Sequence, residues 1–270
     1  MFGVSLGIKV GNSNISGGGV DADAQAYFSR VTTAGGTLTT TEQNAVNQLV
    51  IDMKANGTWT PMKAIYPMVG SSAAACAQNL KSSSFTGTFS SGWTFASTGV
   101  TTNGSSTYFD TTLNPSTTFG SGYASFGVYW RNTFSAAQTN IIGCCSAIST
   151  KRFDLGYDAG VTVPFVGNSS DGSNVSTDTS NLGFLIATRQ GASINKLFRN
   201  AVLKINGNIS WQAYTTRTFY FGARNNSTID YLANNQNIAF GFIGDGLTDA
   251  QASNFYTAVQ TFQTTLSRNV

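Results

Sequence analysis

The sequence contains no histidine and only one glutamate, Glu42, among its 270 residues. Without histidine there is no Ser-His-Asp or Cys-His triad, no histidine-ligated zinc and no imidazole to carry a proton near neutral pH. Charged residues make up only 10 % of the chain, against roughly 25 % in ordinary soluble domains. We therefore expect a protein without catalytic residues, without a metal site and without a cofactor.

Other absences exclude further classes of protein. The 15 basic residues are scattered, and Lys151-Arg152 is their only adjacent pair, so the basic stripe of a nucleic-acid-binding protein is missing. No apolar run approaches the roughly 18 residues of a membrane helix, and the Met1 terminus lacks the basic start of a secretory signal. The three cysteines contain no C-x-x-C pair and predict buried or idle thiols. Because hydrophobic residues reach 41 % and aromatic residues 12 %, the chain is expected to fold.

The first ten residues alternate strictly between large apolar and small or polar side chains. An extended chain places one residue type on each face, so this segment is predicted to be a β-strand. Residues 12 to 19, with three consecutive glycines, follow as a flexible joint. Two interpretations stay open: a first strand of the main sheet, or an assembly arm that adds to a neighbouring subunit by strand pairing. The apolar face of this segment consists of Phe2, Val4, Leu6, Ile8 and Val10.

Residues 21 to 70 have helical periodicity instead. Asp21 is a candidate N-cap for a first helix that Gly35-Gly36 ends. Thr39 with Glu42 three residues later fits a capping box for a second helix, which explains the only glutamate as a cap. Thr60-Pro61 predicts a third, short helix that ends before Pro67.

From about residue 79 to residue 247 the sequence consists of a dozen short β-rich runs separated by turns. Asn103-Gly104 and Asn206-Gly207 each lie between two such runs, and Asn-Gly is the preferred pair for a tight hairpin. Many short strands without intervening helices predict a mainly β fold, an antiparallel two-sheet jelly-roll sandwich. A parallel α/β fold is excluded.

The clearest helix covers residues 249 to 267. Thr248 and Gln251 form a capping box, and apolar residues recur at intervals of three and four along one face. We expect this amphipathic helix to pack on the sandwich, with a short coiled coil as the alternative. The predicted organisation is an arm over residues 1–20, a helical segment over 21–70 and a sandwich with its terminal helix over 71–270.

Several strings together resemble concanavalin-A-like, laminin-G-like domains of bacteriophage virion structural proteins. They include the predicted strand at 124–131 and the segments Lys196 to Leu203, Phe219 to Asn225 and 240–251. The segments 21–27 and 53–67 also look like a stretch that precedes this sandwich in phage virion proteins. The resemblance covers about 250 of the 270 residues and implies a concanavalin-A-like sandwich and a phage setting.

The sequence departs from the hydrolase branch of that superfamily. Retaining glycanases need two carboxyl groups about 5 Å apart, whereas the only glutamate here is a predicted cap and the β region has no Asp pair at i and i+2. Calcium, which parts of the superfamily bind, needs several converging oxygen ligands. The scattered residues Asp154, Asp158, Asp171 and Asp178 do not predict such a site.

Two functions remain. The first is a structural protein at the virion surface, assembled in the bacterial host cytoplasm as a capsid decoration, head fibre or tail component. Its partners would be other virion proteins and further copies of itself, because a low-charge polar surface limits self-repulsion in a symmetric shell. The alternative is a glycan-binding adhesin that recognises a cell-surface polysaccharide. Its candidate contacts are Tyr157, Asp158, Trp211 and Arg224, which ordinary core packing and solvated loops would also explain.

Overall fold

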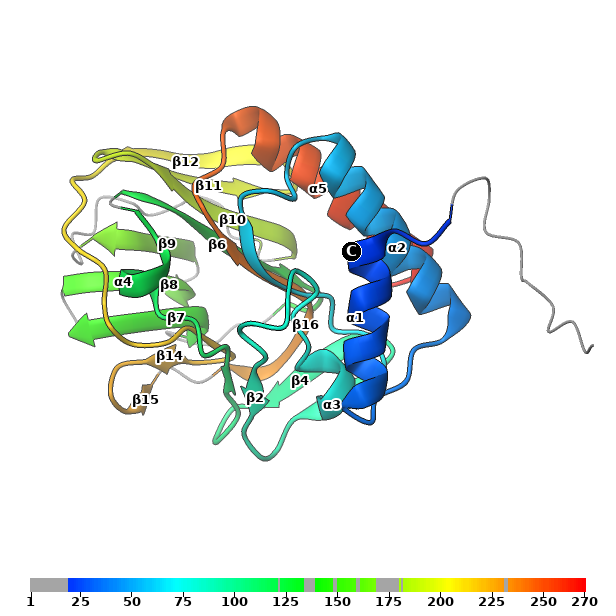
Figure 1. Ribbon diagram of the computed structural model, residues 1–270. Coiled ribbons are helices and arrows are strands. Elements are labelled where there is room, and N and C mark those ends of the chain that lie inside the picture. Colours follow the sequence, from blue (N-terminus) through cyan, green and yellow to red (C-terminus); the bar gives the residue numbers. More distant parts are fainter. Residues whose placement is uncertain are drawn as a thin grey trace, which may run out of the picture.

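The computed structural model describes residues 19–120, 122–133, 139–147, 150–158, 161–168, 180, 182–230 and 233–270. The predicted arm, with Phe2, Val4, Leu6, Ile8 and Val10, lies outside these residues. Figure 1 shows three layers: a group of helices, a first β-sheet and a second β-sheet. The predicted fold class, a mainly β two-sheet sandwich with N-terminal helices and a C-terminal helix, is confirmed.

The two N-terminal helices begin where their caps predict. Helix α1 (Ala22–Thr33) has Asp21 as N-cap, whose side chain accepts the Asp23 N–H. Helix α2 (Thr40–Ala55) has the complete Thr39–Glu42 capping box. The side chain of Asn47 also accepts the backbone N–H of Asp21 at 2.8 Å, which ties the start of α1 to α2.

The predicted third helix is wrong, because Met62–Tyr66 forms strand β1. This strand pairs antiparallel with the C-terminal strand β16 (Asn234–Gly244), where Ile65 lies opposite Phe242. Ala64 and Tyr66 face one hydrophobic core, and Met62 and Ile65 face the other. A strand buried on both faces carries a continuous apolar run, which periodicity alone does not distinguish from a short helix.

The first sheet, sheet A, has eight strands in the order β12-β11-β10-β6-β16-β4-β3, with β1 beside β16. Strand β16 is central, because it pairs with β6 on one side and with β4 and β1 on the other. The remaining strands of sheet A are β3 (Thr94–Ala96), β4 (Gly99–Asn103), β6 (Tyr123–Trp130), β10 (Gly183–Gln190), β11 (Ile194–Arg199) and β12 (Val202–Asn208).

The second sheet, sheet B, has the order β15-β14-β7-β13-β5-β2, with β8 and β9 continuing from β7. It is mixed, because β14 runs parallel to β7. The sequence did not predict β7. The strands of sheet B are β2 (Thr88–Phe89), β5 (Phe109–Asp110), β7 (Thr139–Ala147), β8 (Thr150–Asp158), β9 (Val161–Asn168), β13 (Tyr220–Phe221), β14 (Arg224–Asn225) and β15 (Ile229–Asp230).

Both predicted Asn-Gly hairpins are wrong. Asn206 and Gly207 lie inside β12, and the β11–β12 hairpin turns at Asn200-Ala201, which both have positive φ. The Asn200 side chain accepts the Phe184 N–H at 2.8 Å, so a contact with the neighbouring strand fixes this turn. Asn103 ends β4 in sheet A, and the chain then crosses to β5 in sheet B.

Two hydrophobic cores hold the layers together. The first lies between the two sheets and includes Phe126, Trp130 and Phe153. The second lies between sheet A and the helices and includes Tyr27, Phe184 and Phe255. Two short helices, α3 (Ala73–Cys76) and α4 (Pro115–Thr118), lie in connections that the sequence did not predict to be helical.

Helix α5 (Asp249–Thr265) has the predicted Thr248–Gln251 capping box and packs against α2 and sheet A. Arg268, just beyond this helix, is 1 % exposed. Its guanidinium donates to the carbonyls of Pro67, Met68 and Ala239, and its Nε donates to Gln263. This residue therefore joins the end of α5 to the segment after β1 and to β16. Among the described residues, no helix combines the length and the apolar character needed to span a membrane.

Candidate functional site

A buried arginine organises one end of the sandwich. Arg189, near the end of β10, is completely buried, and its guanidinium donates to the carbonyls of Ala192 at 2.9 Å and Ile209 at 2.8 Å. Burial lowers the pKa of Arg189 to about 10, so the side chain stays charged at neutral pH. It connects the β10–β11 turn to the segment that follows β12.

Asn195 lies beside Arg189. In β11 it is the direct partner of Arg189 on β10 and of Gly207 on β12, and directly opposed residues share one face of a sheet. Because Leu197, two residues further along, packs in the core between the sheets, Asn195 also faces the space between the sheets. Asn195 is completely buried, yet its Nδ2 and Oδ1 atoms have no hydrogen-bond partner.

This lack of partners has an energetic cost. A buried polar group without a partner destabilises the folded state by about 1–3 kcal/mol, and such groups in native proteins call for an explanation. The side-chain amide of Asn195 can donate two hydrogen bonds and accept two. Gly207 on the neighbouring strand has no side chain to pair with it. The amide is thus complementary to a polar molecule from outside the chain.

Two aromatic residues border the same region. Trp211 packs partly buried on the core with its ring centroid 5.5 Å from that of Tyr214, and its backbone N–H donates to Ala192. The indole Nε1 of Trp211 is buried without a hydrogen-bond partner. The hydroxyl of Tyr214 donates to Gly120 at 2.8 Å, and burial raises the pKa of Tyr214 to about 12, so this hydroxyl stays protonated.

Arg189, Asn195, Trp211 and Tyr214 are called the Asn195 cluster below. It combines unpartnered donor and acceptor atoms with aromatic rings, in surroundings that exclude water. Small-molecule sites have this composition: mostly apolar walls with a few polar groups that fix the orientation of the ligand. Sequence analysis selected only Trp211 from this cluster. A polar residue in an alternating strand is normally expected on the solvent-facing side of the sheet. The sequence therefore did not identify Asn195 as a buried residue of a binding site.

The structure does not bring the four predicted glycan contacts together. Arg224 is 1 % exposed and lies 3.5 Å from the carboxylate of Asp154, which also accepts two hydrogen bonds from Arg152 at 2.9 Å. Because Phe153 and Leu155 face the core, Asp154 and Arg224 lie on the other face of sheet B, away from Trp211. Arg224 therefore faces neither solvent nor the Asn195 cluster. Tyr157 and Asp158 end β8, and their side chains lie outside the described part of the chain.

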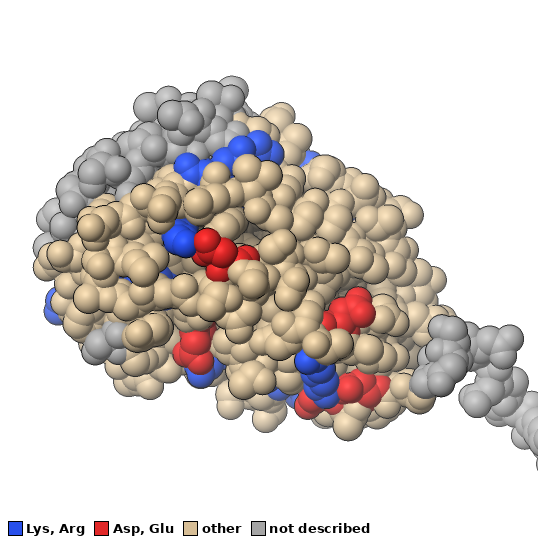
Figure 2. Space-filling view, turned by 90° about the horizontal axis from the view of Figure 1, so that it is seen from above, with Lys and Arg blue, Asp and Glu red and all other residues tan. Residues whose placement is uncertain are grey.

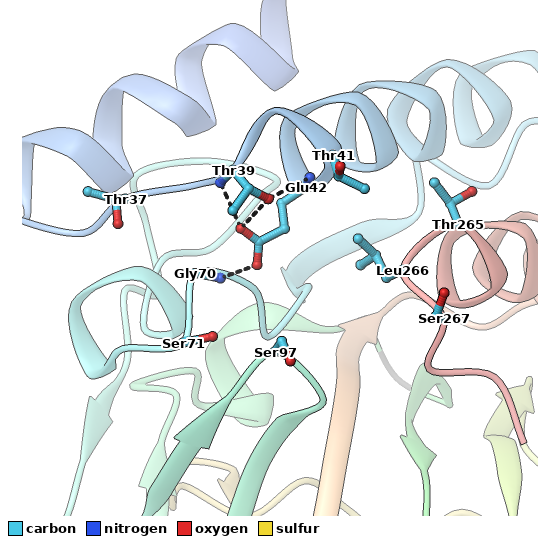
Figure 3. A pocket seen from close by; sticks show the side chains of 10 residues that line it. All are labelled: Thr37, Thr39, Thr41, Glu42, Gly70, Ser71, Ser97, Thr265, Leu266 and Ser267. Carbon is cyan, nitrogen blue, oxygen red and sulfur yellow. Dashed lines mark hydrogen bonds between the residues drawn. The ribbon is translucent and has the colours of Figure 1, made fainter.

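A hollow lies elsewhere on the molecule, between the start of α2, the segment before α3 and the end of α5 (Figure 3). Its volume is about 390 Å³, and it is lined mainly by hydroxyl groups: Thr37, Thr39, Thr41, Ser71, Ser97, Thr265 and Ser267, with Glu42, Gly70 and Leu266. Glu42 accepts the N–H groups of Thr39 and Gly70, both at 2.8 Å. This carboxylate holds the α2 cap and the loop at Gly70, so its role is structural.

The other carboxylates are dispersed as well. Asp21 and Asp23 pair with Lys54, Asp245 with Lys63 and Asp249 with Lys196. Figure 2 shows the charged residues scattered over a mostly uncharged surface. Within the described residues, no group of three or more Cys, Asp or Glu side chains could hold a metal ion.

The sequence matches no protein-family model and no curated protein. Among solved structures, the chain is similar to a mutant of Trypanosoma rangeli sialidase that displays trans-sialidase activity, with a TM-score of 0.52 and 10 % identity over 80 % of this chain and 39 % of that chain. It is also similar to the binding domain of botulinum neurotoxin serotype D, with a TM-score of 0.51 and 14 % identity over 73 % of this chain and 51 % of that chain.

Domain 4 of AbnA, a GH43 extracellular arabinanase from Geobacillus stearothermophilus solved with arabinotriose, aligns with a TM-score of 0.49 and 15 % identity. That alignment covers 72 % of this chain and 98 % of the domain. The chain spans well under two thirds of the matched sialidase and neurotoxin chains. At these identities, the sialidase and neurotoxin matches show a shared β-sandwich fold, and the residues of the site are interpreted from this chain alone.

Proposed function

We propose that the chain is a non-catalytic recognition module that binds a carbohydrate through the Asn195 cluster. The observation that carries the proposal is the buried amide of Asn195, which has no partner among the described residues although it lies beside the cationic Arg189. A sugar hydroxyl both donates and accepts hydrogen bonds, so one ring edge can satisfy the two atoms of the amide. The apolar face of a sugar ring fits against an aromatic ring such as Trp211.

Access to the cluster follows from the same geometry. Trp211 lies on residues 209–219, which have no regular secondary structure, between the end of β12 and the start of β13. Opening this segment to reach Asn195 would break no strand pairing, but it would break the hydrogen bonds from the Ile209 and Trp211 N–H groups to the β10–β11 turn. Binding should then change the surroundings of the Trp211 indole. The similarity to a sialidase and to a toxin binding domain supports a carbohydrate-recognition function only through the shared fold.

Glycan-array binding of the full chain, followed by titration calorimetry with the best sugar, tests the proposal. We expect Asn195→Leu and Trp211→Ala to weaken binding at least tenfold, which corresponds to about 1.4 kcal/mol. Trp211→Phe keeps an aromatic face but removes the indole N–H, and should have an intermediate effect. Ser97→Ala in the hydroxyl-lined hollow is the matched control and should bind normally. Absence of binding to any glycan, or normal binding by Asn195→Leu, contradicts the proposal.

A second candidate is a structural protein of a bacteriophage particle, displayed on the virion surface. The observation that favours it is the resemblance of residues 21–27 and 53–67 to phage virion proteins. In the structure, the first segment lies at the start of α1, and the second connects α2 to β1. Cryo-electron microscopy of particles from a host that expresses a tagged chain tests it. Density at a fixed stoichiometry supports this role, and a chain found only free in the host cell contradicts it.

A further inference from the structure

The β11–β12 hairpin exposes an unusual amount of apolar surface. Only eight large hydrophobic side chains among the described residues are exposed, and three of them lie here: Ile194 is 44 % exposed, Val202 56 % and Leu203 41 %. Scattered single residues of this kind are normal on protein surfaces. Val202 and Leu203 directly follow the hairpin turn, whereas Ile194 pairs with Asn208 at the other end of the hairpin, so the apolar exposure is concentrated at the start of β12.

The hairpin also ends the sheet. Among the described residues, β12 pairs only with β11, so one side of its backbone has no strand beside it. Natural sheets protect such edges with proline, charge or very short strands, since an open edge is a template for another strand. Strand β12 has seven residues and no proline, and Lys204 is its one charged residue. Asn206 and Asn208 along it are exposed, so the edge is open to a neighbour.

The N-terminal segment of the same chain is predicted to be a strand with one apolar face, which can be buried by pairing with such an edge. Residues 2–10 alternate between large apolar residues and glycine, serine or lysine, and their apolar face is Phe2, Val4, Leu6, Ile8 and Val10. A lone strand with one apolar face is not stable in water until it pairs and buries that face. Pairing with an exposed sheet edge supplies backbone hydrogen bonds as well as apolar contacts.

We propose that residues 2–10 of one copy add as an edge strand to β12 of a second copy. The joint of residues 11–19 has nine residues and spans at most about 30 Å. In Figure 1 the described chain begins on the side of α1 that is away from β12, with α2 and α5 between them. A strand from the same copy would have to pass around these helices, whereas a neighbouring copy can place its β12 beside the arm. This interaction goes beyond carbohydrate recognition and does not depend on it.

Self-association of the full chain, measured by analytical ultracentrifugation, is the first test. Leu6→Asp places a charge on the apolar face of the arm, and we expect it to weaken association at least tenfold, because the buried leucine contact is lost and a charge must be buried instead. Ser5→Asp, its neighbour on the opposite face, is the matched control and should associate almost normally. Leu203→Lys in β12 should weaken association like Leu6→Asp. A monomer at all concentrations, or equal association of all variants, overturns the proposal.

Disulfide cross-linking identifies the partner strand. The native residues Cys76, Cys144 and Cys145 are buried and do not compete. A Ser5→Cys variant mixed with an Asn206→Cys variant should form a mixed disulfide dimer under mild oxidation. A Thr257→Cys variant, exposed on α5, should not do so with Ser5→Cys. If cross-links form only within a single chain that carries both Ser5→Cys and Asn206→Cys, the arm occupies its own β12 and the exchange between copies is wrong.

Discussion

Arg268, on the helix-covered side of sheet A, and Asn195, between the two sheets, are both buried polar residues but differ in their hydrogen bonds. On the helix side, Arg268 makes hydrogen bonds to four groups, and Asn79 accepts from Ile65 and Lys81 and donates to Ser84. At the other end, both side-chain atoms of Asn195 lack a partner. Paired buried groups specify one arrangement of the chain, whereas an unpaired group is available to a ligand. The contrast concerns these residues rather than whole regions, because the buried Tyr27 hydroxyl on the helix side also lacks a partner, whereas Arg189 beside Asn195 has two backbone acceptors.

Loss of the Arg268 hydrogen bonds on the helix side should have the largest effect on the free energy of unfolding. Arg268→Ala leaves the carbonyls of Pro67, Met68 and Ala239 buried without their donor. We expect the free energy of unfolding to fall by about 3–5 kcal/mol. Arg268→Lys keeps the charge but loses the planar fork, and should lose less. Urea denaturation followed by tryptophan fluorescence measures both, and a loss below about 1 kcal/mol for Arg268→Ala would show that the hydrogen bonds are not structural.

Removal of the unpaired Asn195 amide should raise the free energy of unfolding instead of lowering it. Asn195→Leu is expected to raise the free energy of unfolding by about 1–2 kcal/mol while it abolishes glycan binding. Tyr27→Phe provides a matched comparison, because the Tyr27 hydroxyl is also buried without a partner but lies on the helix side. It should stabilise the protein by about 1 kcal/mol and leave binding unchanged. Destabilisation by Asn195→Leu would mean that the amide has a structural role.

Alkaline pH should lower the stability of the protein through Cys76, which packs in the core between the sheets. Burial raises the pKa of the Cys76 thiol from 9.0 to about 12. The folded state therefore keeps this proton between pH 9 and 12 while the unfolded state releases it, so stability is complete below pH 9 and falls as pH rises through this window. Between pH 8 and 10, Cys76→Ala should lose about 1 kcal/mol less than the natural chain. Equal losses in urea titrations at the two pH values would exclude a contribution from this thiol.

The smallest effect is expected at the surface pair that links the two regions. Lys196 on β11 lies 2.6 Å from Asp249 at the start of α5, and the Asp249 side chain is 56 % exposed. Exposed ion pairs contribute about 0–1 kcal/mol. Lys196→Met should therefore change the free energy of unfolding by less than about 0.5 kcal/mol, and the difference should vanish in 1 M salt. A larger loss that persists in salt would show that packing, not charge, holds the pair.

Local sequence signals predicted the elements that depend on local contacts. The caps at Asp21, Thr39 and Thr248 place the starts of α1, α2 and α5, because each cap side chain bonds a backbone N–H within three residues. Alternation of large and small or polar residues likewise indicated the segments that form β6 and β13. The two-sheet sandwich followed from the number of short strands, which is a property of the whole pattern.

The errors lie where distant contacts decide. Met62–Tyr66 is a strand because β16 pairs with it, and the β11–β12 turn is fixed by a hydrogen bond from β10 to Asn200. The candidate site is of the same kind. Asn195 is buried by its neighbours on β10 and β12 and by its position between the sheets, so no property of residues 190–200 alone predicts its role.

The pairing of β1 with β16 has a consequence for biosynthesis. Ile65 cannot meet Phe242 until β16 has been synthesised, long after β1, because most of the described strands lie between them in the sequence. Contacts between residues far apart in sequence slow folding, since the intervening loop must close first. The helices near the N-terminus thus emerge long before the strand that completes their sheet, and we expect nascent chains to rely on chaperones until synthesis ends.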